Sequence, residues 1–177
     1  MAQGIFPAPT GDDFVLISSV TPTAGVNTIS FTSISSYRKL ALLVKSPGLS
    51  TNGTISVTLN SDSGSNYAIS YMTYTASSGA ANSATVSSDT TGIAIGAGAA
   101  TGTQKAHLIF DNTHTAGIKT FNGFSNYTNV GATAVVVPTI TGAYYASASV
   151  STVTLTITTA TVNFAASGTV ALYGVKI

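Results

Sequence analysis

Three side chains whose oxygens could surround a metal ion stand close together in the stretch LNSDSGSNYA, residues 59–68. They are Asn60, Asp62 and Asn66. Calcium in proteins takes about six to eight oxygen ligands, usually with several carboxylates. This stretch supplies one carboxylate, and the whole chain contains no glutamate. Asn, Asp and Gly between two strands also bond to their own backbone and stabilise turns. We therefore predict a turn here and no metal site.

The two histidines are the next candidates for chemistry. His107 lies in QKAHLIFD (104–111), which ends at Asp111, and His114 lies in the turn that follows. A histidine–aspartate pair serves catalysis when it activates a nucleophile, but the chain has no cysteine and no Gly-x-Ser-x-Gly motif. Alternation along the stretch places His107 on the face opposite Ala106 and Leu108. We predict surface positions for both histidines and no catalytic residue.

Two further site types are excluded by what the sequence lacks. Glycoside hydrolases need two carboxyl groups roughly 5–10 Å apart, and the five aspartates of this chain stand mostly at turn and loop positions. The glycine-rich stretch 92–102 lacks the lysine and the following helix of a phosphate-binding loop. We expect a flexible loop there and no cofactor.

Tyrosine side chains are the remaining candidates for binding. Exposed tyrosines on a β-surface stack on sugars or anchor subunit interfaces, whereas buried tyrosines belong to the core and have satisfied hydroxyl groups. The best candidates for exposure are Tyr71, Tyr74, Tyr144 and Tyr145. We predict that part of this set lies at an interface.

The composition is that of a folded β-protein with few charges. Hydrophobic residues make up 44% of the 177 residues and charged residues 6%, against roughly 25% charged in an ordinary soluble protein. Ser, Thr, Asn and Gly alternate with apolar residues instead, as in 54–60 and 153–159. The net charge is +1 and the six basic residues are scattered, which argues against nucleic acid as a partner. Weak charge repulsion between copies favours a standing partner or self-assembly.

The elements expected from this alternation are strands. Clear candidates are 37–45, 54–60, 67–74, 104–111, 118–127, 151–159 and 168–177, with 37–45 apolar enough for a central strand buried on both faces. Pro138 interrupts 133–146 and implies an edge strand or a break. The small-residue region 76–103 predicts long loop and weak strand, with a short edge piece at Ile93 and Ile95. About ten strands at this spacing predict an all-β, antiparallel sandwich of the jelly-roll kind.

The amino-terminal residues differ from the rest. Residues 1–13 contain two prolines and two glycines, and their large apolar side chains are Ile5 and Phe6. We expect an extended arm over 1–13 and a single β-sandwich domain over 14–177. The arm is either a frayed end or a plug whose Ile5 and Phe6 fill a hydrophobic groove on a neighbour. The start has no basic and apolar pattern of a secretion signal, and no apolar run nears the roughly 20 residues of a membrane helix.

Three stretches carry a resemblance to a known group of proteins. SISSYRKLALLVKS (33–46), TISVTLNSDSGSNYAISY (54–71) and the closing ASGTVALYGVKI (166–177) resemble small β-sandwich virion proteins of tailed bacteriophages. That group includes capsid decoration (cement) proteins and tail or fibre-associated modules. The matched positions look structural, so no catalytic residue carries over. The chain shows no coiled-coil or repetitive shaft before the sandwich, which favours a decoration protein.

The resemblance implies a virion location and a set of partners. Decoration proteins commonly form trimers over capsid lattice points, so it implies a homotrimer that binds the major capsid protein or another virion protein, with Ile5 and Phe6 docking on the shell. We therefore expect a non-enzymatic capsid decoration protein. The alternative is a tail or fibre-associated module that binds a carbohydrate or receptor, such as a host surface glycan, since jelly rolls serve lectins as well as capsids. A hydrolase is the third hypothesis.

Overall fold

Twelve strands and no helix make up the part of the chain that the computed structural model describes, which is residues 13–76, 82–98, 104–128 and 134–177. The strands are β1 (Val15–Val20), β2 (Thr28–Thr32), β3 (Tyr37–Lys45), β4 (Gly53–Leu59), β5 (Tyr67–Ala76), β6 (Asn82–Thr90), β7 (Ile93–Gly98), β8 (Lys105–Asp111), β9 (Gly117–Thr128), β10 (Val135–Ala146), β11 (Thr152–Ile157) and β12 (Thr169–Lys176). The prediction of an all-β, antiparallel fold is confirmed. Across these ranges no helix is long and apolar enough to span a membrane.

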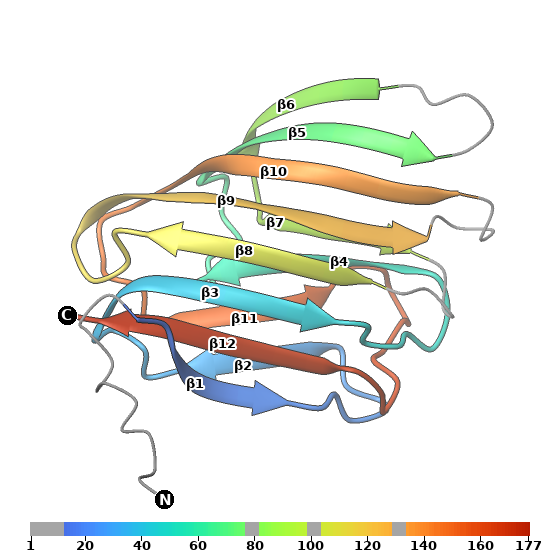
Figure 1. The fold of residues 1–177 in the computed structure, drawn as a ribbon, viewed down its shortest axis with the longest axis horizontal. Coiled ribbons are helices and arrows are strands. Elements are labelled where there is room, and N and C mark those ends of the chain that lie inside the picture. Colours follow the sequence, from blue (N-terminus) through green and yellow to red (C-terminus); the bar gives the residue numbers. More distant parts are fainter. Residues whose placement is uncertain (1–12, 77–81, 99–103, 129–133) are drawn as a thin grey trace, which may run out of the picture.

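The strands form two packed sheets. The large sheet has the order β1-β12-β3-β8-β9-β10-β5-β6 and the small sheet the order β2-β11-β4-β7. Figure 1 shows them face on, with the small sheet behind the large one. When β5, β6, β9 and β10 are left aside, two four-stranded sheets remain, one with the order β1-β12-β3-β8 and the other with the order β2-β11-β4-β7. This is the strand order of an eight-stranded jelly roll. The sandwich prediction is therefore confirmed.

Two hairpins extend one side of this jelly roll. Strands β9 and β10 pair with each other, as do β5 and β6, and β10 pairs with β5 so that all four continue the large sheet beyond β8. In Figure 1 the extension reaches past the small sheet, with β5 and β6 at the top. The large sheet is consequently twice as wide, in strands, as the sheet that covers it.

A hydrophobic core fills the space between the sheets because apolar and hydroxyl side chains alternate along the strands. In β4, Ile55, Val57 and Leu59 are buried and the residues between them are partly exposed. In β8, Leu108 and Phe110 point into the same core. These inward positions follow from the period-two spacing of strand side chains and confirm the orientation predicted for both stretches.

The outer face of the small sheet carries hydroxyl groups almost throughout. Register pairs Thr152 with Thr32, and it aligns Thr154 with both Ser30 and Thr58. The hydroxyls of Ser30 and Thr154 lie 3.2 Å apart, within hydrogen-bond distance. We call this surface the hydroxyl face; its members are Thr28, Ser30, Thr32, Thr54, Ser56, Thr58, Thr152, Thr154 and Thr156. Such side chains bond to water and to one another, so this face needs no covering layer.

Pro138 lies in a central strand, so the predicted edge position is wrong. Strand β10 runs between β9 and β5, and Pro138 is paired in register with Thr73 of β5. On the other side, the ladder to β9 has no paired positions between Val136 and Thr139. Proline has no N–H to donate to a neighbouring strand. The interruption of pairing on the β9 side is the break that was predicted as the alternative to an edge strand.

The small-residue region contains more strand than its composition predicts. The expected edge piece at Ile93 and Ile95 is confirmed as β7, an edge strand of the small sheet in which both side chains are buried. Strand β6 lies in the region predicted as long loop and weak strand, without bounds or a partner, and it forms the edge of the large sheet by pairing with β5. Residues 99–102 of the predicted glycine-rich loop lie outside the described residues.

Candidate interaction surface

The stretch 59–68 is a turn whose polar groups bind one another. The Asp62 Oδ1 atom accepts a hydrogen bond from the Gly64 N–H at 2.7 Å. Its Oδ2 atom accepts from Asn66 Nδ2 at 2.8 Å and from the Tyr144 hydroxyl at 2.9 Å. Burial acts to raise the pKa of Asp62, but these three bonds outweigh it and the pKa is lowered. The carboxylate is thus used within the chain, and the predicted turn is confirmed.

Asn60 anchors the same turn to a second loop. Its Nδ2 atom donates to the Ser149 carbonyl at 3.0 Å, and its Oδ1 atom accepts from the Ser151 N–H at 2.7 Å. Asn60 and Ser61 both have positive φ angles, 55° and 54°, a conformation that asparagine tolerates better than most residues. The described residues contain no group of three or more His, Cys, Asp or Glu side chains that could hold a metal ion.

Tyr144 is buried and belongs to the core. It is 2% exposed, stacks on Tyr67 with ring centroids 4.7 Å apart, and donates its hydroxyl proton to Asp62. Burial raises the pKa of Tyr144, and the bond to the Asp62 carboxylate raises it further. Burial likewise raises the pKa of Tyr67, whose hydroxyl accepts from the Leu59 N–H at 2.8 Å. Tyr144 therefore offers no side-chain surface to a partner.

Tyr71 lies in a cleft at the place where the large sheet extends past the small one. Its hydroxyl accepts a hydrogen bond from the Ala94 N–H at 3.0 Å, and burial raises its pKa. The cleft has a volume of about 260 Å³, and its lining includes Tyr127 and the hydroxyl-bearing Thr54 and Thr73. Aromatic rings beside hydroxyl groups are chemically suited to a small polar ligand.

The other two tyrosines of the predicted set are exposed. Tyr74 of β5 is 50% exposed and Tyr145 of β10 is 52% exposed. The interface prediction therefore applies to these two and, in part, to Tyr71. Ile5 and Phe6, the predicted plug of the arm, lie outside the described residues.

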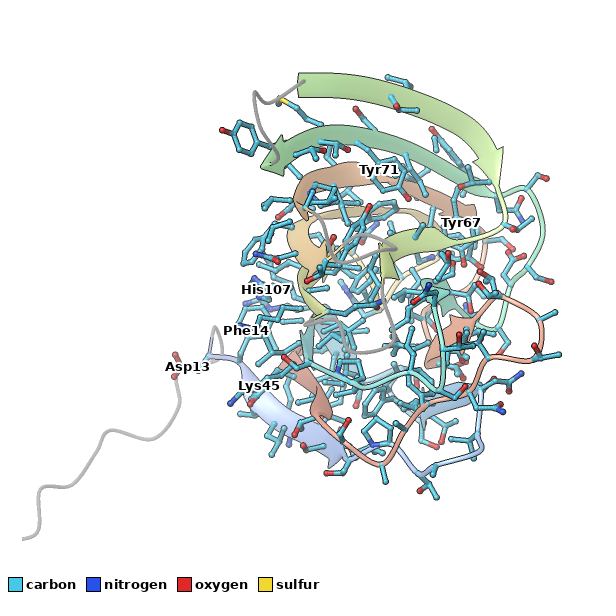
Figure 2. The ribbon with its side chains drawn as sticks, turned by 90° about the vertical axis from the view of Figure 1, so that its right-hand side faces the viewer. Asp13, Phe14, Lys45, Tyr67, Tyr71 and His107 are labelled. Carbon is cyan, nitrogen blue, oxygen red and sulfur yellow. The ribbon has the colours of Figure 1, made fainter. Side chains whose placement is uncertain are left out.

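The outer face of the large sheet is open and carries large apolar side chains among polar ones such as Asn122 and Thr141, and these apolar side chains form the main surface that the sequence analysis missed. We call it the apolar face; its members are Phe14, Leu16, Ala41, Leu43, Met72, Tyr74, Val86, His107, Ile109, Phe124 and Tyr173. Figure 2 shows Phe14 and His107 on the side of the large sheet that faces away from the small sheet, whereas Tyr67 and Tyr71 lie inside.

Strand pairing aligns the members of this face in rows that cross the sheet. One row runs from Leu43 of β3 through His107 of β8 to Phe124 of β9, and continues through Thr139 to Met72 of β5. Phe124 is 52% exposed and Met72 62% exposed. Large apolar side chains that are this exposed and lie in one row indicate an interaction surface, whereas single exposed apolar residues spread over a surface do not.

Two adjoining hollows indent the centre of the apolar face. The first has a volume of about 260 Å³ and is lined by Phe14, Ala41, Leu43, His107, Ile109 and Tyr173. The second, of about 190 Å³, shares Leu43 and His107 with the first and adds Phe124. Both are shallow and apolar, which suits insertion of a partner's side chains better than enclosure of a small molecule.

His107 is part of this surface and not of a catalytic pair. Its ring meets the edge of Phe124 with centroids 5.8 Å apart. Asp111 forms an ion pair with Lys39 at 2.8 Å and is four residues along β8 from His107, a separation of about 13 Å in a strand. The predicted surface position of His107 is confirmed, since it is half-buried on the outer face.

Charged side chains of the sheet stand at the two ends of its central strands. The Lys39–Asp111 ion pair lies at one end of β3 and β8. Lys45 and Lys105 are paired in register at the other end. The rows between them contain Ala41, Leu43, His107 and Ile109.

One signal in the sequence pointed toward this face. The stretch YAISYMTY carries aromatic side chains on both faces of its strand, and only one face of a strand can point into a sandwich core. No protein-family model, no curated protein and no solved structure matches this chain. The function is therefore argued from the surface itself.

Proposed function

We propose that this chain is a non-enzymatic bacteriophage virion structural protein, a capsid decoration (cement) protein that stabilises the shell by adhering to its neighbours. The observation that carries the proposal is the apolar face, an open layer of aliphatic and aromatic side chains on a jelly-roll sandwich. Jelly rolls build viral shells as well as lectins, and the fold alone does not choose between them. The resemblance of residues 33–46, 54–71 and 166–177 to phage virion proteins adds support.

The side chains that could do chemistry support a structural role. Asp62 holds a turn together, and Asp111 pairs with Lys39. His107 packs against Phe124. Adhesion, in contrast, needs only apolar area, since each Å² removed from water contributes about 25 cal/mol. Partners that bind the assembled shell but not its separated subunits stabilise it by mass action. The partners proposed are further copies of this chain and the major capsid protein or another virion protein.

Immunogold labelling of the phage that encodes the chain tests the proposal. Antibodies raised against the purified protein should label the head of intact particles at many sites. Label confined to the tail would replace the decoration role by the tail or fibre role, and particles without label would refute a virion role altogether.

Deleting residues 1–12, which include Ile5 and Phe6, should abolish attachment to the shell without changing the melting temperature. A truncated protein that still coats the shell would show that the arm is not the attachment.

The second candidate is a carbohydrate or receptor-binding module of a tail or fibre. The observation that favours it is the cleft lined by Tyr71 and Tyr127 with threonine hydroxyls beside them, together with the exposed rings of Tyr74 and Tyr145. A glycan array compared between the natural protein and the variants Tyr74→Ala, Tyr145→Ala and Tyr127→Ala tests it. Binding that these variants remove would favour this candidate, and an array without binding would eliminate it for the glycans printed.

A further inference from the structure

We propose that the apolar face binds the apolar face of a second copy of this chain, with the strands of the two copies related by a two-fold axis that runs across them. This inference rests on the proposed structural role, and it replaces the homotrimer implied by the resemblance with a pair. The pair consists of two sandwiches stacked through their large sheets. The apolar face is then the contact between neighbouring copies, and each pair contacts the shell itself through other parts of its surface.

The composition of β3 is the first argument for a covering layer. Strands buried on both faces are nearly continuous in apolar residues, and β3 reads Leu40, Ala41, Leu42, Leu43, Val44. It lies between β12 and β8, inside the large sheet. Its inward side chains are fully buried, yet Leu43 is 40% exposed on the outer face. Ala41 on the same face is already buried within one copy, so Leu43 is the apolar side chain of this strand that a second layer would cover.

The size of the face is the second argument. Eight strands at about 4.8 Å each span about 38 Å, and the rows from Lys39 to Lys45 cover about 20 Å along the strands. The resulting area of the whole outer face, about 760 Å² for each copy and including polar positions such as Asn122 and Thr141, is close to the roughly 800 Å² that each partner buries in a stable interface of standard size. Sheets stack about 10 Å apart with strands crossing at about 30°, and the two hollows around Leu43 and His107 can receive the partner's side chains.

Charge is the third argument, and it selects the orientation. A two-fold axis across the strands superposes β8 on β8 in opposite directions, so Lys105 of one copy lies over Asp111 of the other. At each end two lysines, Lys45 and Lys105, then face the Lys39–Asp111 ion pair. An axis along the strands that ran between β3 and β8 would instead place Lys45 and Lys105 of one copy against the same two lysines of the other. Like charges brought together in an interface cost free energy, so the first arrangement is favoured.

The choice of a second copy over another partner follows from symmetry. A two-fold interface uses the same patch on both subunits, so the patch must be complementary to itself. The apolar face meets this condition because its centre is apolar and its two ends carry an ion pair and a pair of lysines. A net charge of +1 on each chain opposes the association only weakly.

Sedimentation velocity of the purified full chain tests the pairing. We expect a species of twice 17.7 kDa at concentrations of about 10 µM, in the range of ordinary protein complexes. Leu43→Lys and, separately, Phe124→Lys should each give single chains, because they place charges in the middle of the interface. Thr156→Lys on the hydroxyl face is the matched control and should stay paired. Far-UV circular dichroism and the melting temperature show whether each variant is folded.

The outcomes separate clearly. A natural protein that sediments as one chain or as three chains would overturn the pairing, as would folded Leu43→Lys and Phe124→Lys variants that both remain paired. None of these measurements involves a phage particle, whereas the virion role is tested by labelling particles. The pairing can therefore fail while the virion role stands, and the reverse.

Cross-linking tests the orientation separately. The chain has no cysteine, so single cysteines can be introduced at Thr120, which pairs with Asp111, and at Asn126, which pairs with Lys105. The axis across the strands brings position 120 of one copy over position 126 of the other. A bismaleimide reagent matched to the roughly 10 Å between stacked sheets should link Thr120→Cys to Asn126→Cys when the two proteins are mixed. Efficient linking of Asn126→Cys to itself, or no linking in the mixture, would overturn this orientation.

Discussion

Replacing Asp62 by asparagine should destabilise the fold through a group that looks like a metal ligand. The carboxylate accepts from the Gly64 N–H, from Asn66 Nδ2 and from the Tyr144 hydroxyl. In Asp62→Asn the remaining oxygen can still accept from Gly64, but the new amide nitrogen faces the Asn66 Nδ2 donor, and the Tyr144 hydroxyl must accept where it donated to a carboxylate. A hydrogen bond to a charged group contributes about 1.5–3 kcal/mol, and a buried donor without a partner costs about 1–3 kcal/mol. Because Asp62 is partly exposed, we expect a loss of about 2 kcal/mol, near the middle of these ranges.

Chemical denaturation and thermal melting at pH 7 measure this loss. At about 2–4 °C for each kcal/mol in a domain of this size, the melting temperature should fall by about 4–8 °C. The matched control is Asp111→Asn, the same substitution in the ion pair with Lys39 on the surface. Exposed ion pairs contribute at most about 1 kcal/mol, so the control should lose less than Asp62→Asn.

The dependence on pH provides the sharper check. The pKa of Asp62 is lower in the folded chain than in the unfolded one, so its stabilisation is present above the ordinary aspartate pKa of about 3.9 and is lost as the pH falls through the folded value. The difference in free energy of unfolding between the natural protein and Asp62→Asn should decrease by up to about 1 kcal/mol as the pH falls from 5 to 3. A free-energy difference that is constant over this pH range would show that the Asp62 carboxylate does not stabilise the fold through these hydrogen bonds. A loss of stability in Asp111→Asn as large as that in Asp62→Asn would show the same.

Three other substitutions have defined outcomes. Burial raises the pKa of Tyr144 in the folded state, so the unfolded chain releases this proton first and the natural protein should lose stability above pH about 10. Tyr144→Phe should reduce this alkaline loss, and denaturation at pH 8 and pH 11 measures it. Lys119→Met leaves the carbonyls of Gly117, Ala146 and Ala148 without their ammonium donor and should cost about 2–4 kcal/mol in urea denaturation; a loss below that of a surface control would contradict it. Gly142→Ala presses a methyl group against the backbone oxygen of Ala68 in β5, closer than van der Waals contact allows, and should cost about 1–3 kcal/mol, with a lower melting temperature.

Alternation of side chains was enough to predict much of the fold. The stretch 54–60 became β4, with Ile55, Val57 and Leu59 inward as expected. Strand β6 was not predictable from its residues, because Ala, Ser and Thr in Asn82–Thr90 carry little apolar area and fit loop and edge strand equally well. Its place is decided by pairing with β5, a long-range interaction that no local pattern contains.

The candidate site was predictable only in part. Period two places Tyr144 and Tyr145 on opposite faces of one strand, but it does not say which face is inward. That choice depends on the stacking of Tyr144 on Tyr67 and on its bond to Asp62, 82 residues away along the chain. Likewise the run in β3 predicted burial on both faces, and the structure shows that this chain supplies only one of the two layers.

The threonine and serine surface of the small sheet has a consequence for how the protein behaves in solution. Hydroxyl groups neither titrate in the ordinary range nor attract counterions, so salt has little to screen there. If two copies close on their large sheets, the two small sheets of the resulting four-layer slab turn these groups outward. The small sheets then give a third sandwich no apolar layer to stack on, and we expect changes of acidity or ionic strength to alter this little.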